Sequence, residues 1–439
     1  MDTTATATTS AAPRRIAALA LPALVVLAAE PLYVLVDTAV VGHLGSVPLA
    51  AVAVGGTVLT MAAWLGTILA YGTTGRAARR FGSGDRTAAV EEGLQASWLA
   101  FSAGLVIAVG MQFAAGPLAE ALAGNPEIAG SAARWLRVAA LGAPGLLLAA
   151  AGNGWMRGVQ DTRRPLFFVL GANVLSAALC PILVYPAGLG LIGSAIANMV
   201  AQTVAGACFA VALFRERIAW RPRPSVIGEQ LRMGRDLLIR GGAFQLSFLS
   251  ATTVAARFGT ATVAGHQIAM QLWFFTALVL DAVAIAAQSL VGAALGAGDA
   301  DLARALARRI ALIGVVCGVA FAVVIAAGTG IVPRLFTSDA AVRDQAAVAW
   351  PWFVAMQPIG GLVFALDGVL IGAGDVRYLR DTTVVAALGF FVPAIWTAYA
   401  LDWGLNGIWA GLTLFVVVRC VALLLRLRSG GWAVVGAVR

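Results

Sequence analysis

The stretch FGSGD at residues 81–85 returns as LGAGD at residues 295–299, which is 214 positions further along the chain (295 − 81). Further pairs with the same separation are RGVQDTR at 157–163 with IGAGDVR at 371–377, and GLIG at 190–193 with GLNG at 404–407. Chance could produce one such pair, but not several in constant register. The repeats therefore predict two homologous halves.

The boundaries of the halves follow from where the repeated blocks begin and end. We predict a first half at 14–214 and a second half at 236–428, joined by a connector at 215–235 that is rich in arginine. Small polar residues at 1–13 predict a disordered tail, and residues 429–439 form a second tail.

The composition places both halves in a membrane. The chain of 439 residues is 60% hydrophobic and only 12% charged, with a mean hydropathy of +0.89. Soluble domains are about half apolar and about a quarter charged. Apolar stretches of about 20 residues, the length that spans a bilayer, recur twelve times. We place them at 16–42, 49–72, 92–122, 132–154, 166–185, 189–214, 236–258, 264–294, 303–333, 346–371, 382–401 and 405–427.

These stretches should be helices, because backbone groups in hydrocarbon must form their hydrogen bonds within their own segment. The fold class that we predict is an all-α integral membrane protein with twelve transmembrane helices in two six-helix lobes. Six is an even number, so both lobes have the same orientation and are related by a pseudo-two-fold axis along the membrane normal.

The basic residues are all arginines, and most of them fall on one side of the predicted spans. By the positive-inside rule this side is cytoplasmic, so we expect a multi-pass protein of the cell membrane with both termini in the cytoplasm. The positive charge is then an orientation signal, and nucleic acid is not an expected partner. Without lysine a P-loop is excluded. No metal spacing or catalytic constellation is present, so an enzyme is disfavoured.

Four acidic residues lie inside predicted spans, namely Glu30, Asp37, Asp281 and Asp367. An ionised carboxylate facing lipid costs about 2.5–3.5 kcal/mol on insertion scales, so each should face a cavity or carry a proton. The alternative for each is a carboxyl tied to neighbouring hydroxyls for helix packing. Asp37 is the best functional candidate, because the residue 214 positions later is Ala251 and shared packing does not explain a one-sided carboxylate. Asp367 lies nearer the cytoplasmic end and could be an interfacial cap.

The first span combines its two carboxylates with two prolines. Glu30 lies two helical turns before Asp37, about 10 Å along the axis and on the same face. Pro22 and Pro31 each remove a helix hydrogen bond, so we expect this helix to bend. The second half offers a different polar wall. Residues that could line a substrate cavity are Gln267, Gln271, Asp281, Trp64 and Trp273.

Three stretches carry a resemblance to a known family: PLYVLVDTAVVGHLG at 31–45, RGVQDTRRP at 157–165 and GHQIAMQLWFFTALVLDAVAIAAQSLVGAALGAGD at 265–299. They resemble the multidrug and toxic compound extrusion (MATE) family, in particular its DinF-like branch, over nearly the whole chain. The resemblance implies a twelve-helix exporter that couples inward movement of H⁺ or Na⁺ to outward release of organic, often cationic, compounds. It implies no cofactor besides the coupling ion, and a small organic substrate as partner. We also expect a monomer.

In DinF-like members an aspartate of the first helix carries the coupling cation, and the matching residue is Asp37. The family's fifth span often adds two asparagines and an aspartate. Asn173 matches the first asparagine, but Ser176 and Cys180 stand at the other two positions. A sodium site built from several oxygens is weakened by this loss, so we favour protons, with Glu30 as a candidate replacement for the missing carboxylate.

Two other functions remain open. A flippase for lipids or lipid-linked precursors belongs to the same superfamily, but would predict an arginine-rich cavity where the intramembrane charges are mainly acidic. An uncoupled channel or a non-transporting membrane scaffold is the other alternative, and it would be indifferent to replacement of Asp37.

Overall fold

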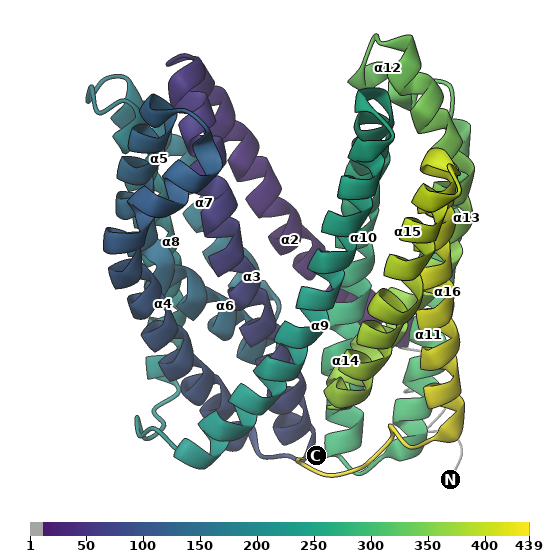
Figure 1. Cartoon of the computed structure of the whole chain (residues 1–439). Helices are drawn as coiled ribbons and strands as arrows, with labels where there is room; N and C mark the ends of the chain where they lie inside the picture. Colours follow the sequence, from purple (N-terminus) through teal and green to yellow (C-terminus); the bar gives the residue numbers. More distant parts are fainter. Residues whose placement is uncertain (1–11, 439) are drawn as a thin grey trace. The chain divides into compact units, whose positions relative to one another are not determined.

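The computed structural model describes residues 12–438, and these residues form helices and short connections without a strand (Figure 1). Most of the chain is built from α2 (Ala12–Gly42), α3 (Ser46–Gly82), α4 (Arg86–Ala123), α5 (Pro126–Ala139), η1 (Ala140–Gly142), α6 (Ala143–Gly158), α7 (Arg163–Val184), α8 (Leu191–Arg215), α9 (Pro224–Arg257), α10 (Thr260–Gly296), α11 (Ala300–Ala327), α12 (Val332–Phe336), α13 (Ala340–Gly372), α14 (Val376–Val384), η2 (Val385–Phe391), α15 (Val392–Ala400) and α16 (Gly404–Ser429). The predicted disordered tail at 1–13 lies almost entirely outside the described residues.

Eleven segments of the described residues are long and apolar enough to cross a membrane. They match eleven of the twelve predicted spans. The predicted seventh span, at 236–258, lies within α9 and is helical, but it is not among the eleven. It carries Asp236, Arg240 and Arg257 as well as several serine, threonine and glutamine residues. The helices are also longer than the predicted apolar stretches, because a helix can continue beyond the hydrocarbon core until a capping residue ends it.

The chain divides into two compact units, which we call the N-unit (Leu21–Gly234) and the C-unit (described residues 12–20 and 235–438). The division differs from the predicted boundaries at both junctions. The first residues of α2 group with the C-unit, and the connector groups with the N-unit. Helices α2 and α9 are thus divided at Ala20/Leu21 and Gly234/Arg235, which are 214 positions apart (234 − 20).

The predicted connector at 215–235 is helical from Pro224 onward, because α9 begins there. Its side chains hold it to the N-unit. Gln230 donates to the backbone oxygen of Glu92 at 2.9 Å, and Glu229 accepts from Arg76 at 2.7 Å. The predicted tail at 429–439 is also structured where it is described, since the Gly436 amide donates to the Leu295 oxygen at 2.9 Å.

The internal repeat is visible in the backbone of each unit. A Cβ added to Gly154 would lie 2.7 Å from the Ala70 oxygen, and one added to Gly368 would lie 2.3 Å from the Ala284 oxygen. The second pair is the first pair shifted by 214 (368 − 154 and 284 − 70). Such distances leave no room for a side chain, so α3 and α6 in the N-unit, and α10 and α13 in the C-unit, cross at the same glycine.

Candidate functional site

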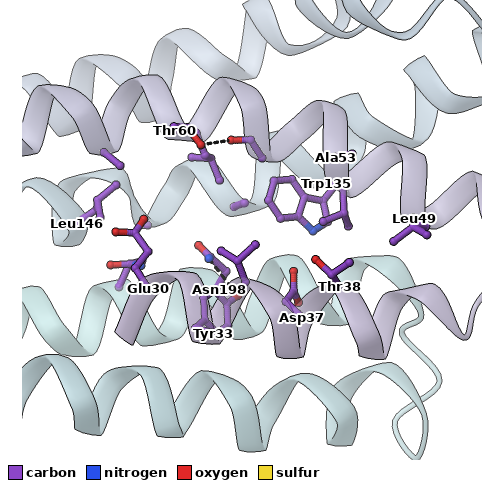
Figure 2. A pocket seen from close by; sticks show the side chains of 18 of the residues that line it. Glu30, Tyr33, Asp37, Thr38, Leu49, Ala53, Thr60, Trp135, Leu146 and Asn198 are labelled. Carbon is purple, nitrogen blue, oxygen red and sulfur yellow. Dashed lines mark hydrogen bonds between the residues drawn. The ribbon is translucent and has the colours of Figure 1, made fainter. Parts of the chain in front are cut away.

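The N-unit contains a cavity of about 690 Å³ between α2, α3, α5, α6 and α8. Figure 2 shows Glu30, Tyr33 and Asp37 along the side of α2 that faces it, with Trp135 and Thr60 on the opposite wall. Its volume is within the range of cavities that hold drug-sized molecules. Most of its other wall residues are apolar, among them Val34, Leu49, Leu59 and Leu146.

Asp37 is the buried carboxylate of this cavity, with only 5% of its surface exposed. Its Oδ1 accepts two hydrogen bonds, from the Ser194 hydroxyl at 2.7 Å and from the Cys180 thiol at 3.1 Å. Ser194 lies on α8 and Cys180 on α7, so three helices meet at one oxygen atom. The arrangement holds the Asp37 side chain in place and supplies two donors to its ionised form.

A second row of hydrogen bonds surrounds this contact. Trp135 donates from its indole nitrogen to the Ser194 hydroxyl at 3.2 Å, which leaves the Ser194 proton for Asp37. One turn before Asp37, the Tyr33 hydroxyl accepts from the Asn198 amide at 3.1 Å. The donors on α5 and α8 therefore fix both the carboxylate and the residue beside it.

Glu30 differs from Asp37 in its surroundings. Its side chain is exposed within the cavity, and it makes no hydrogen bond or ion pair with a side chain of the described residues. In particular it does not bond to Asp37, whose Oδ1 is occupied by Cys180 and Ser194. The predicted role of Glu30 as a replacement partner for Asp37 has no contact to support it.

Glu30 also lines a second, inner cavity of about 170 Å³. Asn173 and Asn153 face that inner cavity, together with Arg157. Asn173 thus lines a different cavity from Asp37, and among the described residues it makes no hydrogen bond to Asp37, although the resemblance implied a partnership. Ser176 is fully buried on α7, one turn before Cys180. Of the three predicted α7 residues, Cys180 is the one with a hydrogen bond to Asp37.

Pro22 and Pro31 both lie inside α2, which continues without a break from Ala12 to Gly42. Pro31 directly follows Glu30 and leaves the carbonyl one turn earlier without its helical donor. Pro22 is the second residue after the point at which α2 passes from the C-unit to the N-unit. The prolines are therefore placed at the junction and beside the acidic residues, where a change in helix direction would move Asp37.

The predicted polar wall of the second half lines neither cavity. Gln267 and Gln271 are exposed on α10, and Trp273 is buried against Gly360 of α13. Asp281 is half-buried on the same helix, and Trp64 of α3 is absent from the lining of both cavities. Among the described residues, no group of three or more His, Cys, Asp and Glu side chains could hold a metal ion.

Asp367 is not an interfacial cap. It is 7% exposed, and its carboxylate pairs with Arg240 and Arg419 at 2.5 and 2.6 Å. The prediction failed because both arginines come from other helices, and a sequence does not show which helices become neighbours.

Sequence reasoning missed Ser194, Asn198, Tyr33 and Trp135. A signal was available for two pairs, because Tyr33 and Asp37 are four residues apart, and so are Ser194 and Asn198. Residues with this spacing share one face of a helix. Trp135 had no such signal.

Comparisons with known proteins agree with this fold. The family model described as MatE matches residues 22–182 and 242–399. The protein DETOXIFICATION 44, chloroplastic, of Arabidopsis thaliana is 33% identical over 433 residues, which cover 95% of this chain and 83% of that protein. DNA damage-inducible protein F of Escherichia coli strain K12 is 31% identical over 423 residues, covering 92% and 90%.

Solved structures show the same fold. A MATE protein crystallised in its bent conformation superposes with a TM-score of 0.87 at 23% identity, covering 95% of this chain and 94% of that one. An outward-facing multidrug resistance transporter of the MATE family superposes with a TM-score of 0.84 at 23% identity, covering 96% and 97%.

Proposed function

Because this chain belongs to the MatE family of membrane efflux transporters, we propose that it is a secondary active exporter that exchanges inward protons for outward organic cations. The exchange would proceed by alternating access in the membrane of the cell, with both termini in the cytoplasm and the protein acting as a monomer. The observation that carries the proposal is the position of Asp37, buried and hydrogen-bonded at the wall of a cavity of about 690 Å³.

Asp37 is suited to bind and release one proton. The Ser194 and Cys180 donors converge on Oδ1, and Oδ2 accepts no hydrogen bond from a described residue. With one oxygen held by donors, the other can take the proton without breaking the existing contacts. The cavity gives that proton a path to and from water.

The same donors favour a proton over Na⁺. Sodium needs several oxygen atoms that point their lone pairs at the ion. The two side chains that bond to Asp37 are a thiol and a hydroxyl, and both direct hydrogen atoms at the carboxylate. Cys180 stands on α7 where the family pattern places an aspartate, so α7 does not supply a second carboxylate beside Asp37.

Glu30 is the residue that we assign to the substrate. Its carboxylate is exposed within the cavity and unpaired in the described structure, and apolar side chains such as Leu146 and Leu59 line the same cavity. A negative charge inside an apolar wall attracts a compound that combines a positive charge with a hydrophobic body. Because substrate and proton would share one cavity, binding of either would change the local charge that the other meets.

The test is uptake of a fluorescent organic cation by proteoliposomes that contain the full-length protein. We expect an imposed pH gradient to drive transport, and a Na⁺ gradient of the same size to drive little or none. Asp37→Asn should abolish the pH-driven component while the protein still inserts and folds. A matched control is Asp301→Asn, which removes a carboxylate that is 94% exposed at the start of α11.

Other outcomes separate the alternatives. If Asp37 were only a packing residue, Asp37→Asn would lower the stability of the protein but leave pH-driven transport in the remaining folded fraction. A channel would carry the dye without either gradient, and a scaffold would carry none in any variant. Either result contradicts the proposal.

A further inference from the structure

Three charged side chains from three helices meet inside the C-unit: Arg240 of α9, Asp367 of α13 and Arg419 of α16. Arg240 donates to Asp367 Oδ2 at 2.5 Å, and Arg419 donates to Oδ1 at 2.9 Å and to Oδ2 at 2.6 Å. The exposed fractions of the three side chains are 11%, 10% and 6%. Arg419 lies ten residues before the end of α16 and Asp367 five residues before the end of α13, so both charges lie inside their helices and nearer to the C-terminal ends.

The charges of this cluster do not balance. Two guanidinium groups share one carboxylate, which leaves one positive charge in excess. The neighbouring carboxylates are engaged elsewhere, since Asp236 pairs with Arg380 at 2.8 Å and Asp375 pairs with Arg426 at 2.7 Å. The Nε atom of Arg240 is buried and donates no hydrogen bond to a described residue. A buried charge without a partner is unfavourable, so the cluster has the capacity for a second anion.

The fold does not require charges at this place, as the other half shows. The residues 214 positions earlier are Val26, Asn153 and Ala205 (240 − 214, 367 − 214 and 419 − 214). All three are neutral, and they line the inner cavity of about 170 Å³ in the N-unit. The same positions therefore surround an open space in one half and carry three charges in the other.

Two aromatic rings hold the arginines in position. The Arg419 guanidinium lies 4.8 Å from the centre of the Phe244 ring and 5.6 Å from that of Phe415. The Arg240 guanidinium lies 5.5 Å from the centre of the Phe244 ring. The two residues are four apart on α9 and therefore share one side of that helix. Phe244 occupies the position that Glu30 occupies in the first half (244 − 214). The exchange replaces a carboxylate by a ring that favours a cation above its face.

We propose that Arg240 and Arg419 form a binding site for the oxyanion group of a ligand, a carboxylate, phosphate or sulfonate, with Asp367 as the internal counter-ion. The fork of a guanidinium matches the two oxygens of such a group. The incoming anion contacts the exposed part of Arg240, the less buried of the two arginines, while Asp367 stays with Arg419. An acidic organic compound and the headgroup of an acidic lipid share this chemistry.

This site does not depend on proton coupling at Asp37. The ligand it selects has the opposite charge to the one that Glu30 would bind. A compound that carries both an acidic and a basic group could use both kinds of residue, and so could two different substrates.

The test measures succinate binding to the purified full-length protein in detergent, by calorimetry and by the thermal unfolding midpoint. Sodium chloride at equal ionic strength is the reference. We expect succinate to bind and to raise the unfolding midpoint. Arg240→Gln should lose this response, and Arg240→Lys, which keeps the charge but not the fork, should weaken it. Arg257→Gln is the matched control, because Arg257 lies on the same helix and also stacks on a ring, that of Trp396 at 4.9 Å.

Asp367→Asn separates a ligand site from a purely structural cluster. Removal of the internal counter-ion should increase the affinity for succinate several-fold, whereas a structural ion cluster would only lose stability. Equal responses of Arg240→Gln and Arg257→Gln would overturn the proposal. If Asp367→Asn does not fold, the comparison of the glutamine and lysine variants at Arg240 still decides it.

A second arm identifies the source of the oxyanion. In nanodiscs of phosphatidylcholine we expect the succinate response to persist, and added phosphatidylglycerol should abolish it only if a lipid headgroup occupies the site. No response to succinate or phosphatidylglycerol in any of these preparations would again overturn the proposal. Asp37→Asn should bind succinate as the unsubstituted protein does, so failure of proton coupling and failure of this site are distinguishable.

Discussion

The N-unit and the C-unit have the same arrangement of turns and helix crossings, but their buried charged residues lie at different positions. Gly45 and Gly259 begin the second helix of each half with φ of 121° and 123°, and Asp85 and Asp299 cap the third with the same 2.8 Å bond to a backbone amide. Asp37 of the N-unit, however, corresponds to Ala251 of the C-unit. Duplication has thus conserved the turns and helix crossings within this chain, while the polar interior of each half is different.

The difference shows that the residues that shape the turns and helix crossings are not the residues that carry the polar groups of each half. Ser194 and Cys180, the donors to Asp37, correspond to Ile408 and Ala394 (408 − 214 and 394 − 214). The C-unit lacks both the carboxylate and its donors, and its own charges lie at positions that are neutral in the N-unit. Asp37 and its donors are therefore present together in one half and absent together from the other.

The largest effect should come from removing the one-sided carboxylate. Asp37→Asn keeps the size of the side chain but cannot release a proton near neutral pH, so pH-driven transport should fall to the level of empty liposomes. Initial rates of dye uptake under a fixed pH gradient measure this.

Moving the carboxylate to the other half should not restore transport. Ala251 is 2% exposed, and Asp at this position would meet no hydroxyl or thiol donor from residues 394 and 408. We expect Ala251→Asp combined with Asp37→Asn to remain inactive and to be less stable than Asp37→Asn alone. Recovery of pH-driven uptake would show that the two halves are interchangeable. It would contradict the view that the carboxylate needs the donors found only in the N-unit.

The shared helix crossings should respond alike in both units. A Cβ on Gly104 would lie 2.4 Å from Pro144 Cα, and one on Gly318 would lie 2.8 Å from Pro358 Cα. Overpacking of this kind costs about 1–3 kcal/mol, so Gly104→Ala and Gly318→Ala should each lower the thermal unfolding midpoint in detergent. Gly110→Ala is the control, because a Cβ there meets nothing within 4 Å. A loss confined to one unit would mean that the two crossings are not equivalent.

The donors to Asp37 should set the pH range of transport. Ser194→Ala removes a hydrogen bond to the ionised carboxylate, which is worth about 1.5–3 kcal/mol. The pH of half-maximal transport should therefore rise by about one to two units. Cys180→Ala should cause a smaller rise, because a thiol is a weaker donor. A structural role for Ser194 would change the amount of folded protein and leave the pH profile where it is.

The smallest effect concerns an ion pair that is present in the N-unit alone. Arg86 holds the pKa of Glu216 below its ordinary value of 4.5, through a hydrogen bond and its charge. A lowered pKa in the folded state stabilises the protein above pH 4.5, and this contribution disappears as the pH falls through the folded-state value.

Because the pair lies at the surface, we expect no more than about 1 kcal/mol. Glu216→Gln should therefore make the thermal unfolding midpoint fall less as the pH is lowered. Glu127→Gln is the control, because Glu127 is exposed. If the unfolding midpoint of Glu216→Gln fell with pH as it does in the unsubstituted protein, the stabilising role of the Arg86–Glu216 pair would be contradicted.

Much of the site could be predicted, but not its partners. Asp37 stood out from sequence because its repeat position is an alanine, and Cys180 because it replaces an expected aspartate. Ser194 is 157 residues from Asp37 in the chain, and its four-residue spacing from Asn198 indicates a polar helix face without showing which carboxylate that face contacts. Glu30 shares a helix face with Asp37, yet one carboxylate is buried among donors and the other is exposed in a cavity. A helical period cannot distinguish these two environments.

The helical spans and the duplication could be predicted from residue order, because hydrocarbon forces a chain to satisfy its backbone hydrogen bonds internally and because blocks such as FGSGD and LGAGD recur in constant register. Which charged side chains meet depends on how the helices pack against one another. Asp367 became the partner of two arginines, and Asp37 the acceptor of a thiol and a hydroxyl, through contacts between helices far apart in the chain. Such contacts depend on distances of a few ångströms between packed side chains, and residue order alone does not contain them.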